Sequence, residues 1–159
     1  MIAIAGSILI FLALCLDFGL SSRIAIGGAK PEFLFVVCMV LSLYPKRSIA
    51  AILGFLCGVL TGSLIGANLT HYAISRTISG FCVAWSREIR LDIRYPVVAL
   101  KVFLATILAG LLFMFGAAPR SLGSYWVDTI GSAVYNGVLA IPTYALLRMV
   151  LGAPDRQRN

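Results

Sequence analysis

The residues best suited to chemistry lie in one short segment, GANLTHYAISRTISGF (66–81), in a chain that otherwise avoids charge for long runs. This segment contains His71, the only histidine of the chain, together with Arg76. Histidine can act as an acid, a base or a metal ligand, and arginine binds carboxylates and phosphates. Such groups in an apolar protein need either solvent or a protected partner. The segment is therefore either a loop or a membrane-spanning helix with a sheltered polar face.

Catalysis at this segment would need further acids, bases or metal ligands close to it. The acidic residues Asp17, Glu32 and Asp128 are scattered along the sequence, and there is no second histidine. The four cysteines, at positions 15, 38, 57 and 82, form neither a CxxC pair nor a cysteine–histidine pattern. The sequence therefore predicts that the protein is not an enzyme and has no metal site and no cofactor.

The composition indicates what surrounds the chain. Of its 159 residues, 60% are hydrophobic and 12% are charged, and the mean hydropathy is +0.99. This is too little polar surface to cover a soluble globule. Since about 20 mainly apolar residues cross a bilayer as a helix, we predict an all-α integral membrane protein. It would be a single domain, residues 1–159, forming a six-transmembrane-helix bundle. The predicted spans are about 2–20, 31–45, 49–66, 69–86, 96–117 and 126–151.

Lysine and arginine are distributed unevenly between these spans. If the N-terminus is cytoplasmic, eight of them lie in inner segments and three in outer segments. Because positively charged loops stay in the cytoplasm, we expect both termini there. The net charge of +7 then reflects membrane topology and attraction to anionic lipids, not binding of nucleic acid.

Small residues recur at every fourth position of the third span, at Ala50, Gly54, Gly58, Gly62 and Gly66. Residues with this spacing share one helix face. A face without side chains lets another helix approach closely, which matters in lipid, where no hydrophobic effect brings helices together. Packing within the bundle is the preferred interpretation, and an interface with another protein is the alternative.

A helical wheel answers the question raised by residues 66–81. One face of this helix is polar and the opposite face is apolar. The polar residues are Asn68, His71, Tyr72, Ser75, Arg76 and Ser79. Gly80 lies on a strip of small residues between the two faces, suited to close contact with a neighbouring helix. We therefore predict an amphipathic span with its polar face towards the bundle interior.

The sixth span offers partners for that polar face. Asp128, Ser132 and Asn136 recur at every fourth position and share one face. Arg76 lies at a depth between those of Asp128 and Asn136, so we expect it to pair with one of them. A polar network that fixes helix register is the preferred interpretation, and a ligand or partner site is the alternative.

Two segments together resemble a known family: AKPEFLFVVCMVLSLYPKRSIAAILGFLCGVLTGSLIGANL (29–69) and SAVYNGVLAIPTYALLRMVL (132–151). Their order of motifs is similar to that of the rod shape-determining protein MreD. The matching motifs are a Pro-acidic pair, a basic pair, a Gly-Phe span rich in glycine, and a Tyr-Asn pair followed by proline. Their residues are Pro31, Glu32, Lys46, Arg47, Gly54, Phe55, Gly58, Tyr135, Asn136 and Pro142. Many members of that family have an aspartate a few residues after the glycine that corresponds to Gly58. This chain departs from that pattern, because its segment GVLTGSLIG contains no acid.

The resemblance implies a non-enzymatic scaffold of the cell-wall elongation machinery, the elongasome, in the bacterial inner membrane. Such a protein is required for rod cell shape and supports peptidoglycan synthesis. Its expected partners are MreC, RodA, a class B penicillin-binding transpeptidase and the actin-like MreB. The resemblance also implies a fold similar to the substrate-binding subunits of energy-coupling-factor transporters. The alternative function is therefore that of a substrate-binding subunit in a vitamin transporter of this type.

Overall fold

A computed structural model of the chain describes residues 2–87, 94–117, 121–152 and 154. These residues form six α-helices, so the predicted all-helical fold is confirmed. The helices are α1 (Ile2–Gly19), α2 (Phe33–Leu41), α3 (Arg47–Ile65), α4 (Leu69–Trp85), α5 (Tyr95–Gly116) and α6 (Leu122–Leu151). The β-type pairing within the described ranges is a single isolated bridge between Ile26 and Ala29.

Three of the helices, α3, α5 and α6, are long and apolar enough to cross a membrane. By contrast, α2 has nine residues, which is too short to cross a bilayer alone. Within the span predicted at 31–45, the structure has α-helix only over Phe33–Leu41. Pro31 and Glu32 precede α2 without helical structure, and a turn follows it before Pro45.

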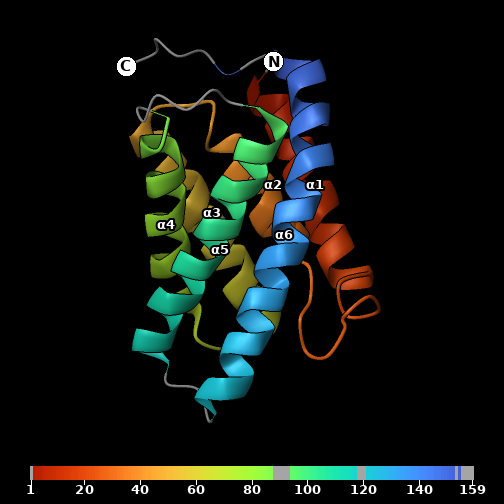
Figure 1. Cartoon of the computed structure of the whole chain (residues 1–159). Helices are drawn as coiled ribbons and strands as arrows, with labels where there is room; N and C mark the ends of the chain where they lie inside the picture. Colours follow the sequence, from red (N-terminus) through yellow and green to blue (C-terminus); the bar gives the residue numbers. More distant parts are fainter. Residues whose placement is uncertain (1, 88–93, 118–120, 153, 155–159) are drawn as a thin grey trace.

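The helices run up and down, and Figure 1 shows which connections share an end of the bundle. The start of α1, the α2–α3 connection, the end of α4, the start of α5 and the end of α6 lie at one end, called here the terminal end (Figure 1). Residues 20–32, the α3–α4 turn, the end of α5 and the start of α6 lie at the opposite, distal end (Figure 1).

The short helix α2 forms the centre of the bundle. It contacts each of the other five helices, and its residues from Leu34 to Leu41 are all buried. The outward faces of the surrounding helices carry large exposed apolar side chains, such as Phe11, Phe55 and Val138. Exposed apolar surface of this extent suits contact with lipid or with other proteins.

The glycine stripe of α3 lies against α4 of the same chain. A Cβ atom added at Gly58 would lie 2.5 Å from Ala73 Cα, and one added at Gly62 would lie 2.7 Å from Leu69 Cα. Such distances are shorter than van der Waals contact, so the two backbones touch only because side chains are missing. The stripe therefore serves packing inside the chain.

Both ends of the predicted stripe have a specific place in the structure. Ala50 is buried. A Cβ atom added at Gly80 of α4 would lie 2.6 Å from the Ala50 carbonyl oxygen. Gly54 also lies against the backbone of α4. Gly66 continues the spacing but takes no part in this contact, because it ends α3 in a left-handed conformation with φ of 70°. That conformation favours glycine at a helix C-terminus.

Candidate functional site

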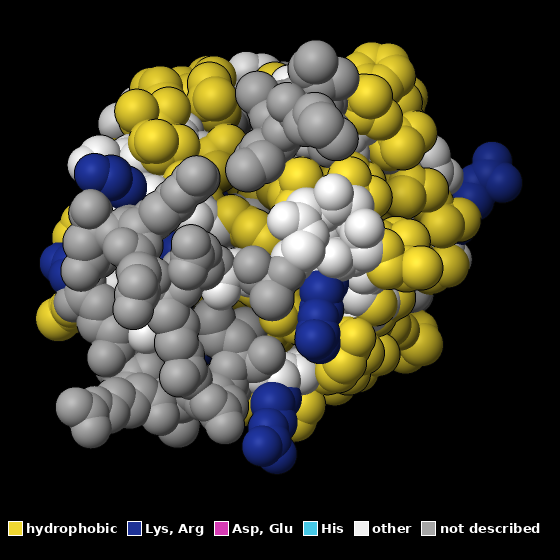
Figure 2. Space-filling view, turned by 90° about the horizontal axis from the view of Figure 1, so that it is seen from above, with side chains coloured by type: hydrophobic (Ala, Val, Ile, Leu, Met, Phe, Trp, Pro, Cys, Tyr) yellow, Lys and Arg dark blue, Asp and Glu magenta, His cyan; other side chains and the backbone are white. Residues whose placement is uncertain are grey.

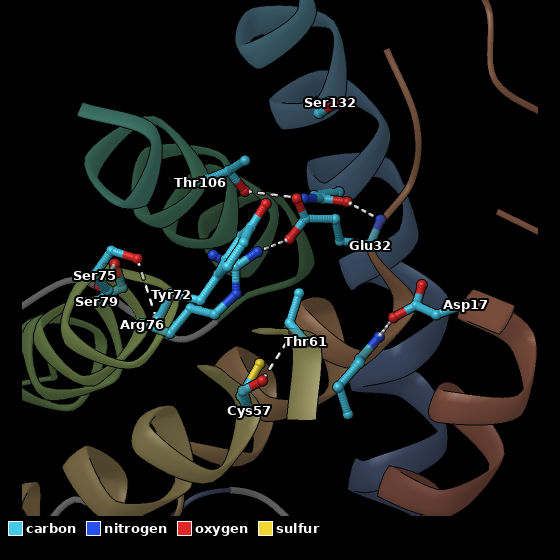
Figure 3. A network of polar contacts seen from close by, with 12 residues as sticks. Asp17, Glu32, Cys57, Thr61, Tyr72, Ser75, Arg76, Ser79, Thr106 and Ser132 are labelled. Atoms are coloured by element: carbon cyan, nitrogen blue, oxygen red, sulfur yellow. Dashed lines mark hydrogen bonds and ion pairs between the residues drawn. The ribbon is translucent and has the colours of Figure 1, made fainter. Parts of the chain in front are cut away.

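The centre of the polar network is an ion pair between Arg76 of α4 and Glu32, the residue before α2 (Figure 3). The Arg76 side chain is only 4% exposed, and that of Glu32 is 29% exposed. The guanidinium carbon also lies 5.1 Å from the ring centre of Phe35 and 4.9 Å from that of Tyr72. One carboxylate and two aromatic faces thus stabilise this buried positive charge.

The pairing of Arg76 with Asp128 or Asn136, expected from the sequence, is wrong. The expectation compared depths along two helices and did not include the chain before α2. Arg76 lies seven residues, or about 10 Å, from the distal start of α4. Residues 20–32 enter the bundle from that same distal end, and they bring Glu32 to the depth of Arg76.

The start of α2 depends on side chains from other helices. The first backbone N–H groups of a helix have no partner within it, and Glu32 provides no side-chain cap here. Instead, the two carboxylate oxygens of Asp17 in α1 accept hydrogen bonds from Phe33 N at 2.7 Å and Leu34 N at 2.8 Å. A carboxylate also suits the positive end of the helix dipole.

A second helix completes this arrangement. Asn136 Oδ1 of α6 accepts a hydrogen bond from Glu32 N at 2.9 Å, and Asn136 Nδ2 donates to Thr106 Oγ1 of α5 at 3.2 Å. One turn earlier, Ser132 Oγ accepts a hydrogen bond from Lys30 N at 3.1 Å. The shared face of α6 therefore holds the segment that leads into α2 (Figure 3).

A cavity of about 200 Å³ lies beside the ion pair. Residues 28–32, α2, α4, α5 and α6 all contribute to its wall. Its charged and polar lining includes Lys30, Glu32, Tyr72, Arg76, Asp128 and Ser132. Non-helical backbone at membrane depth is tolerated where it is buried in protein or lines such a cavity, which accounts for the path of residues 28–32.

The remaining residues of the predicted polar face differ in position. Ser75 and Ser79 are buried, and Ser79 Oγ donates to Ser75 O at 2.8 Å and to Ala105 O of α5 at 3.4 Å. His71 is half-buried with its ring 6.3 Å from that of Phe113. Its Nδ1 atom is buried and has no hydrogen-bond partner among the described residues. Asn68 is exposed, with φ of 55°, and takes no part in the network.

The residues of the family motifs occupy both ends of α2. Pro31 is buried next to the ion pair, and its carbonyl accepts a 2.6 Å hydrogen bond from Ser21 Oγ. Tyr135 of α6 donates a 3.5 Å hydrogen bond to Ile24 O, so it also touches the segment before α2. Pro142 lies inside α6 and is exposed. Lys46 and Arg47 mark the start of α3 at the terminal end.

At the terminal end, the Arg87 side chain binds the backbone that directly follows α2. Its Nη1 atom donates to Leu43 O at 3.0 Å and to Tyr44 O at 3.1 Å. Burial lowers the pKa of the Arg87 guanidinium below its ordinary value, and the nearby charge of Arg47 adds to this effect. Side chains from α1, α6 and the end of α4 thus hold α2 at both ends.

The site residues predicted from the sequence did not include several members of the network, among them Asp17, Thr106 and Lys30. A signal existed for Asp17, because an acid within an apolar span needs a partner in the protein. Thr106 carried no such signal, since a threonine in a helix can bond to its own backbone, as Thr106 Oγ1 also does to Val102 O at 2.9 Å. Within the described ranges, no group of three or more His, Cys, Asp or Glu residues could hold a metal ion.

The fold and this site define an all-helical membrane protein with a buried polar network around a short central helix. Comparison with protein families identifies which one. The model of the rod shape-determining protein MreD matches residues 2–151. The chain therefore belongs to the MreD family, which confirms the resemblance seen in the sequence. Comparisons with curated proteins and with solved structures gave no match, so similarity to energy-coupling-factor subunits stays a prediction.

Proposed function

We propose that this protein is a non-enzymatic scaffold of the cell-wall elongation machinery in the bacterial inner membrane. The observation that carries the proposal is the family match over residues 2–151. The expected partners are MreC, RodA, a class B penicillin-binding transpeptidase and the actin-like MreB. The polar residues of the site are engaged mainly in holding α2, which supports a structural role for them.

The outer faces of the bundle support a role in assembly. Helix α1 packs mainly on α2, and Phe11 and Phe18 are 65% and 82% exposed. The glycine stripe of α3 is already covered by α4. We therefore propose that membrane partners contact other faces, with the open face of α1 as the first candidate.

The orientation of the bundle is part of this proposal. Seen from the terminal end, the described surface shows several Lys and Arg side chains and no acidic ones (Figure 2). Since positively charged segments stay in the cytoplasm, we propose that the terminal end is cytoplasmic. Single cysteines placed in a cysteine-free variant test this. Lys46→Cys should be protected from a membrane-impermeant thiol reagent in whole cells, and Ser121→Cys should react with it. The reverse labelling pattern would overturn the orientation.

Depletion of the protein in its rod-shaped host tests the function. We expect rounded or swollen cells, restored to rods by a plasmid copy of the wild-type gene. The protein purified in mild detergent should bring MreC with it. If depleted cells keep their shape, and the purified protein instead carries a vitamin and an ATP-binding cassette module, the transporter alternative is correct.

A further inference from the structure

The cavity beside the Glu32–Arg76 pair has walls from several parts of the chain. Residues 28–32, α2, α4, α5 and α6 each contribute side chains to it. Its volume of about 200 Å³ lies below the range of roughly 300–1,000 Å³ typical of sites for drug-sized ligands. A solute that fits inside would therefore be small.

The backbone at the start of α2 cannot supply the binding groups of this cavity. The N-terminus of a helix often binds an anion through its free N–H groups. Here the N–H groups of Glu32, Phe33 and Leu34 already donate to Asn136 and Asp17. Binding must therefore use the side chains that line the cavity.

Of the four charged residues on the described part of the wall, two form an ion pair and two do not. Glu32 and Arg76 form an ion pair. The side chains of Lys30 and Asp128 make no hydrogen bond or ion pair with any other described residue, nor with each other. Among the described residues, the cavity therefore presents one cation and one anion that have no partner.

The backbone places these two charges close to the same part of α6. Lys30 N donates to Ser132 Oγ, which is one helical turn from Asp128. On the other side, a Cβ atom at Gly28 would lie 2.8 Å from Asp128 Cγ, and Gly28 has φ of 96°. That left-handed conformation favours glycine, and the missing side chain leaves room for the Asp128 carboxylate.

We propose that this cavity binds a small zwitterionic solute of amino-acid size. Its ammonium group would face Asp128, which is half-buried, and its carboxylate would face Lys30, which is exposed, so each charge of the solute meets its opposite. A purely anionic solute would be repelled by Asp128, and a purely cationic solute would be repelled by Lys30. Ala109 and Phe113 provide apolar wall for the rest of the solute. The proposal is independent of the scaffold function, since it concerns a cavity inside one chain.

Thermal unfolding of the full chain in detergent tests this inference. A solute that binds the folded state raises its unfolding temperature. The probes are the twenty standard amino acids, tested singly, each compared with the amine and the carboxylic acid that lack the opposite charge. We expect a saturable rise with at least one amino acid and a smaller one with its two analogues. No rise with any amino acid, or an equal rise with an analogue, would overturn the proposal.

Variants at the two free charges provide the second part of the test. Asp128→Asn and Lys30→Gln remove no hydrogen bond between described side chains, so the unfolding temperature without solute should stay unchanged. Each should weaken amino-acid binding by roughly 10- to 100-fold, as expected for loss of a contact to a charged group. Arg23→Gln is the matched control, because Arg23 is exposed in the same connection and does not line the cavity. If both cavity variants bind the amino acid as tightly as the wild-type protein does, the inference is contradicted. Co-purification with MreC is a separate measurement, and it tests the scaffold function alone.

Discussion

Along α3 and α4 two backbones touch because glycines leave no side chains between them, whereas the backbone at the start of α2 is held by side chains from distant helices. A Cβ atom at Gly58 would lie 2.5 Å from Ala73 Cα, so the first contact tolerates no added atoms. At α2, the side chains of Asp17 and Asn136 accept the first backbone hydrogen bonds. The second contact therefore tolerates no removed atoms.

The comparison shows two ways to join helices where lipid provides no hydrophobic driving force. Close backbone packing adds many small dispersion contacts. Polar side chains instead satisfy backbone groups that have no water to bind at this depth. Added atoms should therefore destabilise the first contact and removed atoms the second, which the following predictions test.

Loss of Arg76 should have the largest effect. Arg76→Ala leaves the Glu32 carboxylate without its partner, and breaking a buried ion pair costs roughly 3–5 kcal/mol. We expect the lower end of this range because Glu32 is 29% exposed. The free energy of unfolding in detergent, or the yield of folded protein, measures the loss.

A double-mutant cycle identifies the partner of Arg76. Arg76→Ala combined with Glu32→Gln should lose less stability than the two single variants predict together, because the pair is then absent as a unit. The same cycle with Asp128→Asn should be additive. Strong coupling between Arg76 and Asp128 would contradict the pairing described here.

An added side chain in the glycine stripe should have the next largest effect. Gly58→Leu forces α3 and α4 apart, and overpacking of this kind costs roughly 1–3 kcal/mol. Gly123→Leu is a suitable control, since a Cβ atom at Gly123 would have no neighbour within 4 Å. The unfolding temperatures of the two variants should differ clearly, and equal values would show that the α3–α4 contact can open without cost.

Removal of the Asp17 carboxylate should have the smallest effect of the three. Asp17→Ala deprives Phe33 N and Leu34 N of their acceptor, and loss of a helix cap costs roughly 0.5–2 kcal/mol. Asp17→Asn keeps one acceptor oxygen and should lose less. Ser22→Ala, at an exposed position nearby, serves as the control for unfolding measurements. A stable Asp17→Ala variant would mean that water reaches the start of α2.

Several features of the site could be predicted from local spacing. The spacing of α4 indicated that Ser75, Arg76 and Ser79 share a face, and these three residues are buried in the structure. The spacing in α6 placed Ser132 and Asn136 on one face, and both bond to residues 30–32. Helical periodicity is a local property, so it can be read from consecutive residues.

The partners across the bundle could not be predicted in the same way. Glu32 and Arg76 are 44 residues apart in the sequence, and no local pattern links them. The path of residues 20–32 into the bundle decides their contact. The apolar run at 31–45 also concealed how short α2 is, because apolar composition is the same in a spanning helix and in a buried central one.

The sequence by itself determined that the chain is apolar, helical and a member of the MreD family, because composition, periodicity and the order of motifs are properties of the linear chain. It also determined which residues are polar within an apolar environment and so need partners. The tertiary structure alone decided that α4 covers the glycine stripe, that Glu32 neutralises Arg76, and that Lys30 and Asp128 remain unpaired among the described residues. These contacts depend on how distant segments lie in space, and a buried charge such as that of Arg76 is stable only where that arrangement provides its opposite.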